Sequence, residues 1–374
     1  MNRKKTKFIE GAGYFSLFDQ LIESMYNGKK VRANGSPISR GTIANYEVLR
    51  RHLQGFADQD NFTLRIYNDL QLTARERKSA AHYHMKLYKA FLKYLYAKGL
   101  YDNYVGLLIR NWRSFYNYLN DDLHMYVGSY HKKFHVPKDE IPVVALTKKQ
   151  LFTLLYDEEL QAELTSRKLI EVRDLFIVGC TVALRYSDLK RLSKLQLQKK
   201  EQHYYLDVRA AKTQIETRML LPSYCVDIFK KYLKRGDHLL PQISLQYFNR
   251  KVKELSELIP ENDYLHKVRE RKGKTIIRQK DPKTQRKLKL SDHISSHTMR
   301  RTAISIMLES GMDEILVRRI SGHAPNSKEF YRYVRLAQHR LDAETTRVFS
   351  FEDMKGKAWG CDGEIIGSTN MRFE

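Results

Sequence analysis

Residues 293–335 read HISSHTMRRTAISIMLESGMDEILVRRISGHAPNSKEFYRYVR, and the interpretation of the whole chain starts from this stretch. His297 and Arg300 are three residues apart at the head of an apolar-periodic segment, which places them on one face of a helix. A second short helix is followed by one more histidine and two tyrosines, His323, Tyr331 and Tyr333. Arginine offers a fork of donors that matches a phosphate, histidine transfers protons near neutral pH, and tyrosine can act as a covalent nucleophile. The stretch therefore predicts phosphoryl transfer to a tyrosine without a metal.

The composition indicates a folded protein with a polyanionic partner. The 374 residues include 67 Lys and Arg against 43 Asp and Glu, a formal net charge of +24. Hydrophobic residues make up 42% and aromatic residues 11%, which is typical of chains with packed cores, and the length suits two domains. A basic excess of this size favours nucleic acid as the partner. A membrane is disfavoured because the chain has no long uncharged apolar run and no signal-peptide pattern.

The three cysteines argue against a disulfide framework. Cys180, Cys225 and Cys361 are scattered and show no C-x-x-C spacing, which favours a reducing cytoplasm and no zinc site. No cluster of acidic residues suggests another metal, so we expect no cofactor.

The N-terminal third predicts a small helical bundle. Apolar residues recur at helical spacing over four segments, 14–27, 42–56, 79–97 and 104–119. No strand-like alternation precedes residue 135, so residues 13–130 are predicted to form one helical domain after a basic, disordered arm at 1–12. Lys78 and Lys86 are candidate phosphate contacts, although each could equally belong to a solvated helix face.

The following region predicts a linker and a buried helix. Residues 131–144 are basic and proline-flanked, which is typical of a linker. Thr147 can cap the next helix, and residues 168–184 form a nearly continuous apolar helix. Arg185 follows the end of this helix, where a charge near a buried segment needs either an ion-pair partner or a functional role. Asp188 is its candidate structural partner, and Ser187 can cap the next short helix.

Two hairpins are predicted in the second half. Alternation over residues 203–222 indicates a hairpin with Lys212 at its turn. Residues 267–289 carry eleven Lys or Arg and two acids, and Asp281-Pro282 suggests the turn of a second hairpin. This basic segment is either a hairpin along a phosphate backbone or a poorly ordered loop. Its candidate DNA contacts are Arg271, Lys272 and Lys274.

These motifs, in this order, resemble the tyrosine recombinases of the phage integrase family. The resemblance is carried by ALRYSDL at 183–189, by His-x-x-Arg, by Gly-His and by a terminal tyrosine, with Ala183 in place of the usual glycine. The context SSHTMRRTA, SGH and F-x-x-Y is most similar to integrases of Bacteroides-type mobile elements. Residues 41–46, GTIANY, are similar to the opening of the family's core-binding domain.

The resemblance implies a mainly α fold with a small β component. It implies a helical, SAM-like core-binding domain and a catalytic domain with β-hairpins over residues 145–350, then a C-terminal tail at 351–374. It also implies roles for seven residues and one DNA contact. They are the clamp Arg185 and Arg300, the acid Lys212, the proton-transfer residue His297, the phosphate ligand His323, the supporting Asp188, the nucleophile Tyr333 and the DNA contact Arg301.

The nucleophile is ambiguous by one residue. Most family members place the tyrosine nine residues after the second histidine, which here is Arg332. Tyr333 fits the Phe-x-x-Tyr form with Phe330 leading, whereas Tyr331 fits the commoner Ile-Tyr-Thr-His form. Tyr333 is preferred, and Tyr331 remains the alternative.

The implied activity is site-specific DNA recombination through a 3′-phosphotyrosyl intermediate, in integration, excision or inversion. The implied partners are double-stranded DNA bearing recombination sites, a homotetramer on that DNA, and a DNA-bending accessory protein. The implied location is the cytoplasm, at the nucleoid. The alternatives are a type IB topoisomerase, which shares the chemistry, and a catalytically inactive DNA-binding regulator.

Overall fold

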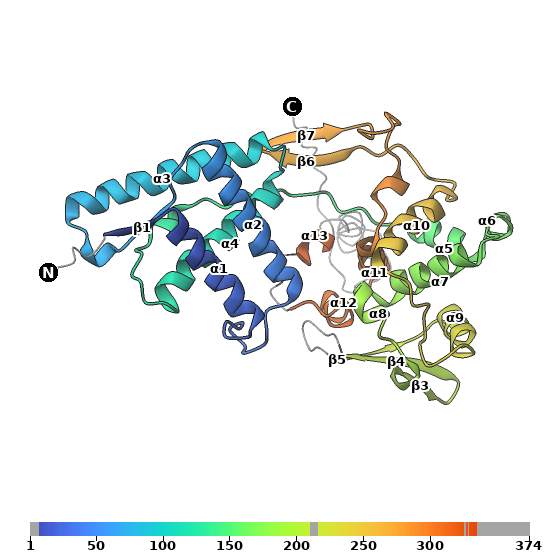
Figure 1. The fold of residues 1–374 in the computed structure, drawn as a ribbon. Coiled ribbons are helices and arrows are strands. Elements are labelled where there is room, and N and C mark those ends of the chain that lie inside the picture. Colours follow the sequence, from blue (N-terminus) through green and yellow to red (C-terminus); the bar gives the residue numbers. More distant parts are fainter. Residues whose placement is uncertain (1–6, 210–215, 325–326, 328, 335–374) are drawn as a thin grey trace, which may run out of the picture. The chain divides into compact units, whose positions relative to one another are not determined.

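The computed structural model describes residues 7–209, 216–324, 327 and 329–334 (Figure 1). The chain divides into two compact units. The helical unit comprises Met1–Pro142 and His266–Arg286, and the second unit comprises Val143–Leu265 and Lys287–Glu374. The predicted fold class, mainly helical with small antiparallel sheets, is confirmed.

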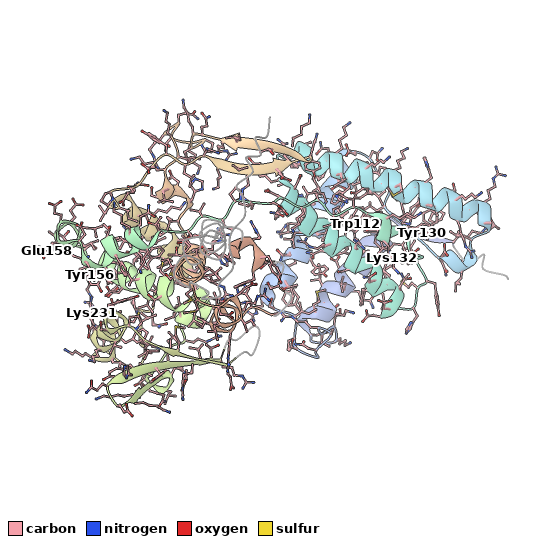
Figure 2. All side chains as sticks on the ribbon, turned by 180° about the vertical axis from the view of Figure 1, so that it is seen from behind. Trp112, Tyr130, Lys132, Tyr156, Glu158 and Lys231 are labelled. Atoms are coloured by element: carbon pink, nitrogen blue, oxygen red, sulfur yellow. The ribbon has the colours of Figure 1, made fainter. Side chains whose placement is uncertain are left out.

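Four helices form the body of the helical unit. They are α1 Ala12–Tyr26, α2 Arg40–Gln59, α3 Ala74–Ala97 and α4 Asp102–Asp121. Each covers one of the four predicted helical segments. Their apolar faces meet around Trp112 of α4, which is fully buried and marked in Figure 2. The indole Nε1 of Trp112 donates to the hydroxyl of Tyr14 at 2.7 Å, which joins α4 to α1 inside the core.

The predicted boundaries of this unit need two corrections. The expected arm at 1–12 is not disordered throughout, because β1 Phe8–Glu10 pairs antiparallel with β2 Arg65–Tyr67. Three-residue strands are too short to give a visible alternation. The 3₁₀ turns η1 Asp69–Gln71 and η2 Tyr130–Lys133 also belong to this unit. Much of the predicted linker is packed against the bundle, since His131 and Phe134 are buried and the unit extends to Pro142.

The basic segment at 267–289 forms an ordered hairpin, and its turn was predicted in the wrong place. Strands β6 Lys267–Arg271 and β7 Lys274–Arg278 pair antiparallel, so the turn lies at Lys272–Gly273. Both turn residues have positive φ, 56° and 68°, as a tight two-residue hairpin requires. Asp281 instead accepts the amides of Lys283 and Thr284 in a separate local turn. The hairpin belongs to the helical unit, so the predicted catalytic domain at 145–350 is interrupted.

The second unit is built on α7. Its helices are α5 Lys148–Tyr156, α6 Glu158–Glu163, α7 Arg167–Val182, α8 Tyr186–Leu189, α9 Ser223–Leu233, α10 Leu245–Glu257, α11 Ser296–Glu309, α12 Glu314–Ser321 and α13 Tyr331–Val334. Its remaining elements are the sheet β3 Leu197–Lys200, β4 His203–Arg209 and β5 Glu216–Leu220, and the 3₁₀ turns η3 Lys194–Gln196 and η4 Leu290–His293. Helix α7 is nearly all buried and contacts α5, α9, α10 and α11.

Helix ends in this unit follow their capping residues. Thr147 caps α5, as predicted, and forms a capping box with Gln150, and Asp313 caps α12. Gly322 ends α12 in a left-handed conformation at φ 62°. The predicted cap at Ser187 is wrong, because the N-cap position of α8 is Arg185. Over the described part of the chain, no helix combines the length and the hydropathy needed to cross a membrane.

Candidate active site

The break between α7 and α8 positions Arg185. Helix α7 ends at Ala183, whose φ of 55° is left-handed and turns the chain sharply. A left-handed alanine costs on the order of 1 kcal/mol relative to glycine, so this turn is held by its surroundings. Arg185 then begins α8. Its Nη1 is buried and has no hydrogen-bond partner among the described residues, which leaves a charged donor ready for an acceptor.

Close packing of α11 on α7 positions Arg300. A Cβ at Gly179 of α7 would lie 2.4 Å from the sulfur of Met299, so only glycine allows this approach. Arg300 is 6% exposed, and its Nη1 donates to the carbonyl of Ala183 at 3.0 Å. The first turn of α11 is thereby fixed to the end of α7. Arg185 and Arg300 consequently line one narrow cavity, together with Asp188 and Ser321.

The left-handed end of α12 positions His323 beside Arg300. The Nη2 of Arg300 lies 3.2 Å from both ring nitrogens of His323. The hydroxyl of Ser321 lies 2.7 Å from the carbonyl of Val317 and 2.8 Å from Nδ1 of His323. When the hydroxyl donates to Nδ1, the ring proton is on Nε2, which can then donate to an anion. Ser321 was not predicted from the sequence, although it is only two residues before the histidine.

The cluster carries more positive than negative charge. Burial, followed by the nearby Arg185, lowers the pKa of Arg300 to about 10. Burial, followed by Arg300 and Arg185, lowers the pKa of His323 to about 3. Burial, followed by Arg301, lowers the pKa of His297 as well. Both histidines are therefore neutral at pH 7, and the cluster is suited to bind an anion.

Asp188 is the acidic member of the cluster, and its partner was missed in the sequence. The side chain is buried and accepts a hydrogen bond from Arg191, one helical turn further on. The spacing of three residues was the available signal. Asp188 and Arg191 also line a neighbouring cavity of about 640 Å³, whose wall includes strands β4 and β5. Arg218 on this wall is paired with Asp207.

The two candidate nucleophiles have different surroundings. Phe330 is fully buried in a cluster between α11 and α12, and Tyr333 packs on that cluster. The centroid of the Tyr333 ring lies 6.1 Å from that of the His323 ring. Tyr331 is 48% exposed, and the guanidinium of Arg318 lies over its ring, 4.9 Å from the centroid, in a cation–π contact. Tyr333 therefore lies beside His323, whereas Tyr331 contacts Arg318.

The remaining predicted residues lie in several places. Lys212, the loop around Pro325, and the chain beyond 334 are outside the described residues. His297 is in the first turn of α11 and keeps solvent exposure, and Arg301 is half-buried beside it. Lys78 and Lys86 are exposed on α3, and Lys274 is exposed on β7. Arg271 and Lys272 contact Tyr96 of α3, so part of their bonding capacity is used within the helical unit.

The described cysteines and acidic residues do not match the ligand sets that metal ions need. Cys180 and Cys225 are free and buried, and burial raises the pKa of the Cys225 thiol to about 12. Over the ranges the structure describes, no group of three His, Cys, Asp or Glu residues is arranged to hold a metal ion. The positive charge available in the cavity is supplied by arginines.

The family match shows that the chain is a tyrosine-type site-specific DNA recombinase, a DNA strand transferase. The chain belongs to the phage integrase family, whose model matches residues 146–340. No curated protein matches the sequence.

Three solved structures show the same fold. XerH recombinase in a post-cleavage complex with palindromic difH is 14% identical, with a TM-score of 0.56 over 90% of this chain and 85% of that one. A lambda integrase dimer bound to a COC′ core site is 13% identical, with a TM-score of 0.53 over 85% and 76%. A lambda integrase tetramer bound to a Holliday junction is 13% identical, with a TM-score of 0.54 over 86% and 76%.

Proposed function

We propose that Arg185 and Arg300 clamp the scissile phosphate of a DNA duplex. Support comes from the buried, unpartnered Nη1 of Arg185 and from the burial of Arg300 beside it. Two guanidinium groups in one narrow cavity repel each other, and a phosphodiester would relieve that repulsion. The same donors then stabilise the extra charge on the pentavalent transition state.

We further propose that Tyr333 is the nucleophile. The observation that carries this assignment is the contact of its ring with that of His323, while the Tyr331 ring lies under the guanidinium of Arg318. A tyrosine that attacks a clamped phosphate must lie within reach of the clamp. Tyr331 would have to leave its arginine first.

The proposed step transfers the phosphoryl group from the 5′ oxygen of DNA to the Tyr333 oxygen. The Tyr333 oxygen forms a bond to phosphorus, and the bond from phosphorus to the 5′ oxygen breaks. The phenol proton moves to His297, which is neutral because its pKa is lowered, and Lys212 protonates the leaving oxygen. His323 hydrogen-bonds the phosphate, and Asp188, held by Arg191, keeps the arginines in place. The product is a 3′-phosphotyrosyl ester and a 5′-hydroxyl. Attack by a second 5′-hydroxyl reverses the step without ATP.

The proposed partner is duplex DNA carrying recombination sites, bound by a homotetramer. The similar lambda integrase structure is a tetramer on a Holliday junction, which supports this assembly. Integration, excision and inversion use the same chemistry. A DNA-bending accessory protein, a nucleoid location and a Bacteroides-type mobile element as source remain predictions from the resemblance.

The test is to trap the covalent adduct. The chain would be incubated with fragmented DNA of its own host and then denatured. DNA attached to protein would be sequenced, and the modified peptide identified by mass spectrometry. Tyr333→Phe should abolish the adduct because the nucleophile is lost. Tyr331→Phe is the matched control and should retain it. An adduct on Tyr331, or one that survives Tyr333→Phe, would refute the assignment.

The same experiment separates the two alternatives. Adducts spread over DNA without a shared sequence, together with relaxation of a plasmid lacking that sequence, would indicate a type IB topoisomerase. A folded chain that binds DNA and gives no adduct would indicate an inactive regulator.

A further inference from the structure

The tip of the basic hairpin is bound by a buried carboxylate. The amide of Lys272 donates to Oδ1 of Asp102 at 2.8 Å, and the amide of Gly273 donates to Oδ2 at 2.9 Å. In a two-residue turn with positive φ, these are the amides that the hairpin ladder does not use. Asp102 is the first residue of α4, lies 170 residues away in the chain, and is 2% exposed.

Neighbouring side chains complete the contact. The hydroxyl of Tyr96 donates to Asp102 at 2.7 Å, and Arg271 donates to the carbonyl of Tyr96. The guanidinium of Arg278 donates to the hydroxyl of Tyr101 at 2.8 Å. We call Tyr96, Tyr101 and Asp102 the Asp102 cradle. Figure 1 shows the tip of the β6–β7 hairpin at the C-terminal end of α3, the helix that carries Tyr96.

A second buried carboxylate faces the same hairpin. Asp139 is 3% exposed, and neither of its carboxylate oxygens has a hydrogen-bond partner among the described residues. Its closest cation is Arg269 of β6, at 3.9 Å. Buried carboxylates are costly unless compensated. The chain has a net charge of +24, and two buried carboxylates contact this one hairpin. Their position indicates that the helical unit binds the basic segment specifically.

The base of the hairpin is anchored elsewhere. In the second unit, the amide of Leu265 donates to the carbonyl of Leu288 at 2.9 Å, and Tyr264 pairs with Lys289. The chain therefore passes between the two units three times, at 142–143, 265–266 and 286–287. Two of these passages, at 265–266 and 286–287, flank the hairpin.

We propose that the Asp102 cradle is a docking site for the Lys272–Gly273 turn of the same chain, and that the docked hairpin is a second tether between the units. A tether of this kind reduces the independent motion of the two units and so raises affinity for DNA that both contact. Asp102 is then a positioning residue for DNA binding and takes no part in the strand-transfer chemistry.

The test compares Asp102→Asn with Asp121→Asn in the full chain. Asp121 is exposed at the other end of α4, so its variant removes the same charge without touching the cradle. Asp102→Asn removes the charge and replaces one of the two acceptor oxygens by an NH2 donor, which then faces one of the two backbone amides. Hydrogen exchange at Lys272 and Gly273, and tryptic cleavage within 267–289, should each rise roughly tenfold or more. Asp121→Asn should change neither.

The functional readout separates binding from chemistry. Asp102→Asn should weaken DNA binding several-fold, while the rate of adduct formation on saturating DNA stays unchanged. Normal hairpin protection in folded Asp102→Asn would overturn the docking site, and unchanged DNA affinity with a released hairpin would overturn the tether. If Asp102→Asn fails to fold, Tyr101→Phe decides by the same measurements, because it removes the cradle hydroxyl that accepts from Arg278 and leaves the turn intact. Protection that disappears on dilution would show that the hairpin of a second copy occupies the cradle, which overturns docking within one chain.

Discussion

Replacing Arg300 by lysine should separate charge from geometry at the phosphate clamp. Arg300 donates to the carbonyl of Ala183 through Nη1, and its Nη2 contacts His323. A lysine ammonium keeps the charge but cannot reach the carbonyl, the histidine and a phosphate in one fixed plane. The lost bond to Ala183 is worth about 1 kcal/mol, so the variant should still fold.

The expected defect is in the chemical step. Loss of one preorganised donor to a developing oxyanion costs about 2.7–4 kcal/mol, roughly a hundred- to a thousandfold in rate. The assay is single-turnover formation of the covalent adduct, on the DNA sequence recovered by adduct trapping. DNA affinity of Arg300→Lys should change only a few-fold, since flanking phosphate contacts dominate binding.

Arg301→Lys is the control variant, because Arg301 is the next residue of α11 and is half-buried. It should alter affinity modestly and leave the rate of adduct formation intact. If folded Arg300→Lys forms adduct within about tenfold of the wild-type rate, the guanidinium is not a specific transition-state ligand, and the proposed clamp is wrong.

Three further outcomes are expected. Asp174 of α7 is fully buried and accepts hydrogen bonds from three side chains. Asp174→Asn should therefore lower the free energy of unfolding of the second unit by about 3–5 kcal/mol in urea titrations. A change below about 1 kcal/mol would contradict this expectation. Burial lowers the pKa of His84 to about 3 and that of His131 to about 4, so their contribution to stability is complete above about pH 6.5 and is lost as the pH falls toward those values. At about pH 5 each histidine should cost the helical unit about 2 kcal/mol, and equal urea midpoints at about pH 5 and 7.5 would refute this. Ser321→Ala should slow adduct formation about tenfold and change its pH profile by freeing Nδ1 of His323, whereas Ser321→Thr should largely restore both, and a wild-type profile in the alanine variant would exclude the role.

Helix boundaries could be predicted from the sequence where residues at the boundary itself determine them. Thr147 and Asp313 mark helix starts through their own side chains, and Gly322 marks an end, so these boundaries were predictable. The buried helix before Arg185 was equally clear from its apolar run. Ala183 stood out only as a departure from a motif, and the reason that glycine suits this position is the positive φ that the structure shows.

Structural features that depend on contacts with residues far away in the sequence could not be predicted. Asp281-Pro282 is a stronger local turn signal than Lys272–Gly273, yet the latter is the hairpin turn. Its partner is Asp102, and nothing near either position in the sequence indicates the other. The proposed choice of Tyr333 likewise rests on the contact of Tyr331 with Arg318, which joins two separate helices.

The two-part composition of the helical unit constrains how such a protein can be recombined with its own relatives. A chimaera that exchanges only residues up to 142 would pair a foreign bundle with the resident hairpin, and Asp102 would then face a turn selected for another partner. Inheritance of the N-terminal module should therefore be linked to inheritance of residues 266–286, although more than a hundred residues of the other module separate them.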